Sequence, residues 1–275
     1  WYNETLNTST RGSRKEFPAV AVIVTTATNV TIYDGDDPDL PMWMDFQSGS
    51  YFFIGPGNRV KNSAHMLNGI LCVTKSGSTS WMSYISFVDD TARQYSDNDG
   101  EKRDYLVPIS YRNSSNANAV VNSIQAYTIA NDETNDVAMT VLPNAPIDDA
   151  TGLPVPTIAV ATDGGVSVLK DDGTVINGTS TSSSNYSQTK QITFTEENYL
   201  WWLADYFGGG ANLRDSYALS LDTLPSSDFT WDNGSDNLSV GDYYAVTTGN
   251  ESGDIKIGYQ NDWAWNKQER NALGG

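Results

Sequence analysis

The sequence predicts an all-β fold, arranged as a β-propeller-like array of about five blades of three to four antiparallel strands each. Short runs rich in Val, Ile, Thr and Tyr recur along the chain and are cut by Asn, Asp and Gly, as in strands joined by tight turns. Groups of these runs follow one another roughly every 40–60 residues, a spacing that suits propeller blades or an irregular sandwich. The aromatic content of 11% indicates a sizeable core rather than disorder.

The clearest unit of this pattern is the segment 156–177. Its apolar residues Ile158, Val160, Val166 and Val168 alternate with small or polar ones, which is the period of a half-buried strand. Asp163-Gly164-Gly165 and Lys170–Thr174 suit tight turns, and Gly164 and Gly173 are expected to hold the positive φ angles that glycine tolerates. We therefore expect a three-stranded meander whose free edges must pack or pair further.

The beginning of the chain predicts a related group of strands. Residues 1–16 are polar and are expected to form a lead-in segment or surface loop, with the propeller-like domain over residues 17–275. The run Ala19–Thr25 is continuously apolar and rich in β-branched residues, which is typical of a central, fully buried strand. An alternating strand over Asn29–Tyr33, an acidic turn over Asp34–Asp39 and an outer strand over Pro41–Phe46 complete this group.

The later groups follow the same logic. Further strands are predicted over 68–74, 81–88, 92–95, 105–111, 120–129, 137–142, 192–195, 199–206, 216–221, 242–247 and 254–259. The polar or proline-rich segments 96–104, 143–156 and 178–190 are expected to be loops. In the segment 199–206, Leu200 and Leu203 also fit helical spacing, but its aromatic density and the glycines that follow favour a strand.

The charge balance limits the classes of partner. Sixteen Lys and Arg residues against 34 Asp and Glu residues give a formal net charge of −18. This charge disfavours nonspecific binding to nucleic acid or to an anionic membrane surface, since both would repel the chain. The sequence also contains no apolar run long enough to span a bilayer, so neither nucleic acid nor membrane insertion is expected.

Cys72 and His65 are the sole cysteine and the sole histidine of the chain. An intrachain disulfide is therefore excluded, and Cys72, within an apolar run, is expected to be a small buried side chain. Serine triads, histidine-ligated zinc and histidine general bases would all have to use His65, which disfavours hydrolases of those kinds. Catalysis by Asp or Glu side chains is not excluded by this argument.

Two groups of residues are candidate binding sites. The turn residues Asp34, Asp36, Asp37 and Asp39 could ligate a structural calcium ion through carboxylate oxygens, although a solvated hairpin turn is the simpler reading. No other cofactor is expected. Trp263 and Trp265, two apart in a polar tail, would lie on one face of a strand and could stack on sugar rings.

Part of the chain resembles a known family. The stretch Asn135–Leu142, the loop to Pro156 and the hairpin Thr157–Val168 look like the β-propeller regions of long tail-associated proteins of marine bacteriophages. The stretch Asn68–Tyr95, with its hairpin closed by Asp89-Asp90-Thr91, is similar to a blade of those proteins. The resemblance implies an extracellular virion component of the tail, bound to other tail subunits, and it offers no catalytic residues. Independently of the resemblance, the sequence is expected to be an internal piece of a longer polypeptide or a processed or trimmed chain.

Taken together, these observations predict a non-catalytic structural and adhesive module of a phage tail or tail fibre that contributes to recognition of host-surface glycan. A tail enzyme that degrades polysaccharide, either a carboxylate-based glycosidase or a lyase, is the alternative. A general ligand-binding propeller outside any virion is a third reading. A cluster of carboxylates in a concave pocket would favour the enzyme, and a flat aromatic face would favour the adhesin.

Overall fold

The computed structural model describes residues 1–49, 53–55, 61–75, 81–97, 101–105, 107–114, 119–123, 128–180, 188–196, 198–208, 211–231 and 246–248. Strands take up 50% of the chain and helical turns 3%, which confirms the all-β prediction. The strands form four sheets in which neighbouring strands are antiparallel, apart from one parallel pair between β13 and β17.

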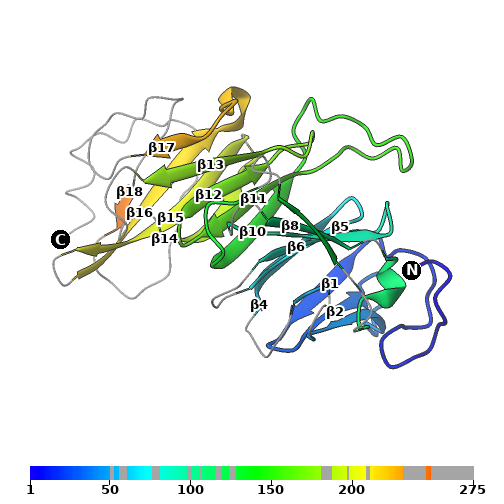
Figure 1. Ribbon diagram of the computed structural model, residues 1–275. Helices are drawn as coiled ribbons and strands as arrows, with labels where there is room; N and C mark the ends of the chain where they lie inside the picture. The colour runs from blue at the N-terminus through cyan, green and yellow to red at the C-terminus, as the bar shows by residue number, and fades with distance from the viewer. Residues whose placement is uncertain are drawn as a thin grey trace.

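The sheets follow one another along the chain (Figure 1). The first contains β1 (Ala21–Thr25), β2 (Asn29–Asp34) and β3 (Met42–Gln47). The second contains β4 (Lys61–Leu67), β5 (Ile70–Lys75), β6 (Met82–Ser86), β7 (Thr91–Tyr95), β8 (Glu101–Tyr105) and β9 (Ala119–Ser123). The third contains β10 (Thr134–Thr140), β11 (Thr157–Thr162), β12 (Gly165–Leu169), β13 (Val175–Ser180) and β17 (Phe229–Trp231). The fourth contains β14 (Gln188–Phe194), β15 (Tyr199–Gly208), β16 (Ala211–Ser220) and β18 (Val246–Thr248).

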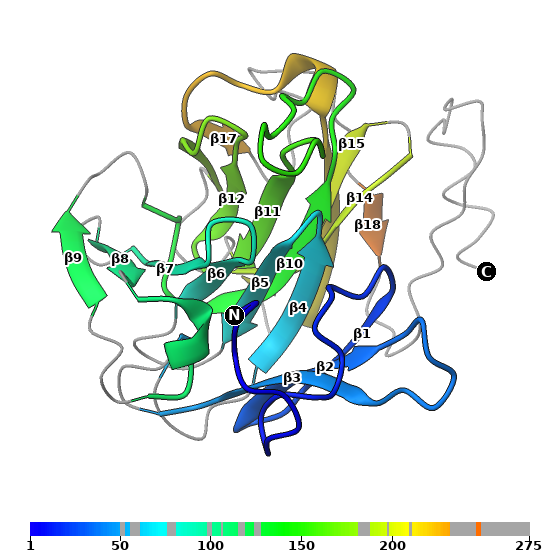
Figure 2. The same cartoon turned by 90° about the vertical axis from the view of Figure 1, so that its right-hand side faces the viewer.

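Each sheet begins with an edge strand, and these first strands hold the sheets together. β1 contacts β4, β4 contacts β10, and β10 contacts β14 (Figure 2). Side chains of β10 bond the backbone of both neighbouring sheets. The Thr134 hydroxyl accepts from the Lys75 N–H and donates to the Lys75 carbonyl, and the Asp136 carboxylate accepts from the Ile192 N–H at 3.0 Å. β10 therefore joins the second and fourth sheets to its own sheet.

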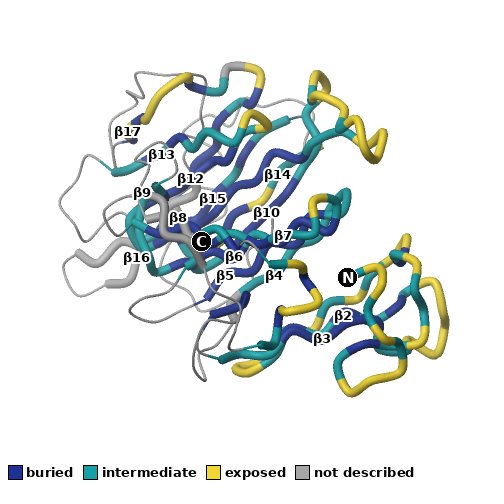
Figure 3. The backbone as a smooth tube through the Cα atoms, turned by 45° about the vertical axis from the view of Figure 1, so that its right-hand side comes forward, coloured by how far each residue is buried: buried dark blue, intermediate teal, exposed yellow. Residues whose placement is uncertain are grey.

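The interior is divided into three apolar clusters that follow this arrangement. One joins the first two sheets around Trp43 and Phe46, one joins the last two around Trp202 and Trp231, and one lies between β5 and β10 around Cys72. β5 and β12 are buried along their whole lengths and are drawn in dark blue in Figure 3.

Several predicted elements are confirmed. The meander forms as β11, β12 and β13, and the segment 199–206 is part of strand β15 rather than a helix. The segment 143–156 is a loop, as expected. Of the last two predicted strands, 242–247 overlaps β18 at its end, and 254–259 lies outside the described residues.

The prediction for Ala19–Thr25 was wrong about burial. This run forms β1, but β1 is an edge strand, and Val20, Val22 and Val24 are 57%, 38% and 43% exposed. The continuous apolar run conceals an alternation in which Ala21 and Ile23 pack against the core while the valines face outward. Composition alone does not reveal whether the outer face of such a strand is covered.

Three local predictions also need correction. Residues 101–104, expected in a loop, form strand β8, because backbone pairing with β7 and β9 does not require apolar side chains. The expected strand 105–111 contains only the end of β8 and a short 3₁₀ turn, Ile109–Tyr111. Positive φ is found at Gly165 (+137°) and Gly173 (+79°) but not at Gly164. The residue with positive φ is the one after the turn, Gly165, which is the first residue of β12.

The N-terminal segment is tied to the first sheet by a buried arginine. Arg112, 1% exposed, donates from Nη1 to both carboxylate oxygens of Glu4 at 2.9 and 2.8 Å. Its Nε donates to the Asp45 carbonyl and its Nη2 to the Thr10 carbonyl, and Nη1 also reaches the Ile109 carbonyl at 3.3 Å. Residues 1–16 therefore do not all lie at the surface, since part of this segment completes the shell around a guanidinium group.

We expect Arg112→Met to lower the free energy of unfolding by ~3–5 kcal/mol, because it removes the hydrogen-bonded partner of the Glu4 carboxylate and leaves only the more distant Arg11, at 3.9 Å. Urea denaturation measures the loss. Arg93→Met is the matched control, since Arg93 pairs with Asp104 at 3.4 Å but is 37% exposed, and about 1 kcal/mol or less is expected. Equal losses in the two variants would contradict the structural role of Arg112.

Gly165 provides a second test of the fold. We expect Gly165→Ala to lower the free energy of unfolding by ~1–3 kcal/mol through the backbone angle alone, and further because the new Cβ would overlap the carbonyl of Gly178 on β13. Gly152, at φ +68°, has nothing within 4 Å of the same position. Gly152→Ala should therefore cost only about 1 kcal/mol. Thermal melts that show the larger loss for Gly152→Ala would refute this packing.

Candidate functional site

The predicted calcium turn is organised around an arginine. Arg14 contacts the carboxylates of Asp34 and Asp36 at 2.7 and 2.8 Å. Asp36 also accepts from the backbone N–H groups of Ala19 and Val20 at 2.9 Å each. These backbone bonds, together with Arg14, lower the pKa of the Asp36 carboxyl. The turn therefore binds a cationic side chain and fixes the start of β1.

The other two aspartates of the turn lie apart from this ion pair. Asp37 accepts from the backbone N–H of Asp39 at 2.9 Å, which is a local turn bond. Within the described ranges, no three His, Cys, Asp or Glu side chains gather closely enough to hold a metal ion. The structure thus brings together Asp34 and Asp36 but not all four residues, and calcium binding stays a prediction. Trp263 and Trp265 lie outside the described residues.

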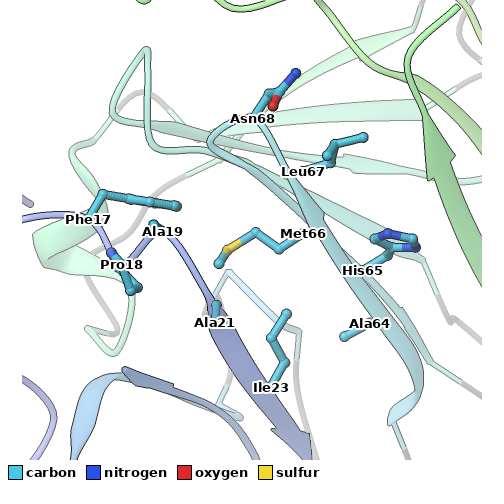
Figure 4. Close-up of a pocket in the computed structure, with 10 residues that line it drawn as sticks. All are labelled: Phe17, Pro18, Ala19, Ala21, Ile23, Ala64, His65, Met66, Leu67 and Asn68. Atoms are coloured by element: carbon cyan, nitrogen blue, oxygen red, sulfur yellow. The ribbon is translucent and has the colours of Figure 1, made fainter. Parts of the chain in front are cut away.

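A cavity of about 540 Å³ lies between β1 and β4. Figure 4 shows the side chains of Ile23 and Met66 in the space between the two strands, with the imidazole of His65 on the other side of β4. Burial lowers the pKa of His65, and the charge of Asp136 on β10 partly opposes this. The lining contains no Asp or Glu, so the cavity does not supply the paired carboxylates that a glycosidase needs.

A pair of carboxyl groups lies elsewhere, where β7 is followed by the charged segment. The Asp132 carboxylate accepts from the backbone N–H of Asp97 at 2.9 Å, and the Asp97 carboxylate accepts from the Asn131 amide at 3.2 Å. Burial, together with the neighbouring Asp97 carboxylate, raises the pKa of Asp132 to about 6. A carboxyl group that keeps its proton near neutral pH can serve as a general acid.

Sequence reasoning did not single out Asp97 or Asp132. They are 35 positions apart, and the chain contains 34 acidic residues, so nothing in their spacing marks them as a pair. The dipeptide Asn131-Asp132 before β10 is the one local pattern that includes Asp132, but this pattern predicts a turn and not a catalytic carboxyl group.

The loop 143–156 is the most prominent exposed feature among the described segments. It projects from the ends of β10 and β11 as the long green loop of Figure 1. Ile147 and Leu153 are 58% and 44% exposed. The Asp148 N–H donates to the Leu153 carbonyl and the Val155 N–H to the Pro146 carbonyl, which holds the loop in a hairpin-like shape. The Asn68 side-chain amide donates to the Pro154 carbonyl at 2.8 Å, which fixes the loop to the turn between β4 and β5.

The titration of Asp132 gives a testable pH dependence. Its raised folded-state pKa means that the folded chain holds this proton more tightly than the unfolded chain. The stabilisation is complete below the unfolded pKa of about 4 and is lost as the pH rises through about 6. Relative to Asp132→Asn, the wild-type free energy of unfolding should fall between these pH values in urea denaturation.

Asp148 supplies a control of opposite sign. Hydrogen bonds from Thr151 lower the pKa of the Asp148 carboxyl, so its stabilisation is present above the unfolded pKa and is lost as the pH falls. The difference between wild type and Asp148→Asn should therefore increase as the pH rises. The same sign for both variants would contradict the environment described for Asp132.

None of the described helical turns is long or apolar enough to cross a bilayer. A scan against the models of known protein families and a search of curated proteins both find no match for this chain.

Proposed function

We propose that the chain is a non-catalytic structural and adhesive module of a bacteriophage tail or tail fibre, which contributes to recognition of glycan on the host surface. The observation that supports this most directly is the loop 143–156, an ordered, exposed loop carried by two paired strands of the central sheet. Loops on rigid β scaffolds commonly carry binding, because they vary without disturbing the core.

We also propose that the four sheets are blades of a β-propeller. Successive sheets meet through their first strands, which is how the inner strands of neighbouring blades meet around a propeller axis. The described strands do not close a ring, and the second sheet contains six strands rather than four. The predicted fifth group, 242–247 and 254–259, falls mostly outside the described residues.

The chemistry of the loop suits a sugar. Ile147 and Leu153 offer apolar surface to the C–H face of a pyranose ring, and the carboxylates of Asp148 and Asp149 can accept from its hydroxyl groups. Trp263 and Trp265 are proposed as a further stacking pair, and the Asp34–Asp39 turn as a structural calcium site. The proposed partners are other tail subunits, and the proposed location is the virion.

The proposal is tested by incubating the purified chain with host cells and with extracellular polysaccharide from the same water. We expect cell binding without release of reducing ends. Replacing Ile147 and Leu153 with serine should weaken binding at least about tenfold, a loss of about 1.4 kcal/mol. Val20→Ser, at an equally exposed apolar residue away from the loop, is the control and should bind like wild type. Loss of binding in the control but not in the loop variant would refute the assignment.

The Asp97–Asp132 pair favours a second candidate, a carboxylate-based depolymerase of the glycosidase or lyase type. Its supporting observation is the raised pKa of Asp132 beside a second carboxyl group. Release of reducing ends or of unsaturated sugars that is abolished by Asp132→Asn would replace the adhesin proposal with this one. Binding of a small ligand without any cell binding would instead favour a ligand-binding propeller outside a virion.

A further inference from the structure

A single side-chain amide joins the loop 143–156 to the second sheet. Asn68, in the turn between β4 and β5, donates from Nδ2 to the Pro154 carbonyl at 2.8 Å. The other hydrogen bonds of the loop join residues of the segment 142–156 to one another. Among the described residues, the Asn68 amide is therefore the sole hydrogen-bond link between this loop and the rest of the protein.

The residue that makes this link is followed by a glycine. Asn68 and Gly69, with φ of 48° and 78°, form the half-buried tip of a hairpin that is closed by the pair Leu67–Ile70. In an Asn-Gly dipeptide the backbone nitrogen of the glycine can approach the side-chain carbonyl carbon of the asparagine, because glycine has no Cβ to obstruct it. A hairpin tip is also a place where a sheet opens locally at low cost.

We propose that Asn68 is a site of deamidation, and that this modification releases the loop 143–156. The backbone nitrogen of Gly69 attacks Cγ of Asn68 when the tip opens. A bond forms between these two atoms, the bond from Cγ to Nδ2 breaks, and Nδ2 leaves as ammonia with the proton of the Gly69 amide. Water then opens the cyclic imide at either of its two ring bonds to nitrogen, which gives an aspartate or an isoaspartate. Water is the only co-reactant.

Both products remove the donor that holds the loop. An ionised carboxyl group has acceptors only, so it would face the Pro154 carbonyl with no proton between them. The loop itself contains Asp148 and Asp149, and a new negative charge at its point of attachment adds to this acidic surface. The loop keeps its internal bonds and is released as a unit. An effect of this release on glycan binding rests on the function proposed for the loop above.

A second Asn-Gly dipeptide in the chain serves as an internal control. Asn177-Gly178 lies within β13, which is paired on both sides by β12 and β17. The Asn177 amide donates to the Thr128 carbonyl at 2.8 Å, and its side-chain oxygen accepts from the Ser167 hydroxyl at 2.7 Å. The same reaction there requires three strands to separate and two side-chain bonds to break. Asn68, with one such bond at a hairpin tip, should therefore react first.

The first test follows the modification itself. The whole folded chain is kept in mildly alkaline buffer, and peptide mapping by mass spectrometry measures the conversion of each asparagine over time. We expect Asn68 to convert at least about tenfold faster than Asn177, because local opening differs between the two sites. In concentrated urea the fold no longer protects either dipeptide, and the two residues should convert at similar rates. Chromatography of the peptides separates the aspartate from the isoaspartate product.

The second test measures release of the loop with Asn68→Asp, which has the side chain of one product. Hydrogen exchange at the amides of Asp148 and Val155, both bonded within the loop, should become about two- to tenfold faster, as the loss of one hydrogen bond of ordinary net strength gives. Asn113→Asp is the matched control. The Asn113 amide also donates to a backbone carbonyl, that of Asp45 at 3.0 Å, and its replacement should leave exchange in the loop unchanged. Circular dichroism checks that both variants are folded.

Two outcomes would overturn the proposal. Conversion of Asn68 no faster than that of Asn177 in the folded chain would mean that the hairpin tip is not the reactive site. Unchanged exchange in the loop of Asn68→Asp would mean that the loop is held without this amide. Cell binding is measured separately on the same variant. Faster exchange with unchanged cell binding would support release of the loop and would contradict the adhesive role proposed for it.

Discussion

The structure depends on how the free edges of its sheets are covered. An edge strand presents N–H and C=O groups that need partners, and every sheet of this chain begins with such a strand. Side chains of β10 supply such partners to two sheets: Thr134 bonds the backbone of Lys75 at the end of β5, and Asp136 accepts from the Ile192 N–H of β14. The second and fourth sheets therefore each depend on the third sheet for backbone partners, which links the three sheets in the order in which they occur along the chain.

The parts of the fold that were predictable are those set by local chemistry. The turn at Asp163-Gly164 and the aromatic strand β15 follow from residues that restrict the backbone or favour a pleated surface. β4 was overlooked, although Asn68-Gly69, with φ of 48° and 78°, is the usual signature of a two-residue hairpin and requires a strand on each side. The exposure of β1 was not predictable, because it depends on which sheet lies beyond it.

The candidate sites were predictable only where their residues are close together in the sequence. The acidic turn was found because its aspartates are adjacent, but its partner Arg14 lies 20 positions earlier, so the ion pair was not visible. The Asp97–Asp132 pair depends on the packing of the segment after β7 against the segment before β10. The raised pKa of Asp132 comes mainly from burial, which no spacing of acidic residues in the sequence encodes.

The loop 143–156 has a consequence for how the protein can vary. Its base is closed by the pairing of Thr140 with Thr157, so the register of β10 and β11 is set below the loop and does not depend on its length. Lengthening such a loop costs only closure entropy, about 0.6 kcal/mol for each doubling. The tip can therefore accept insertions and new side chains while the scaffold stays the same. The sequence of this surface can change without loss of folding stability.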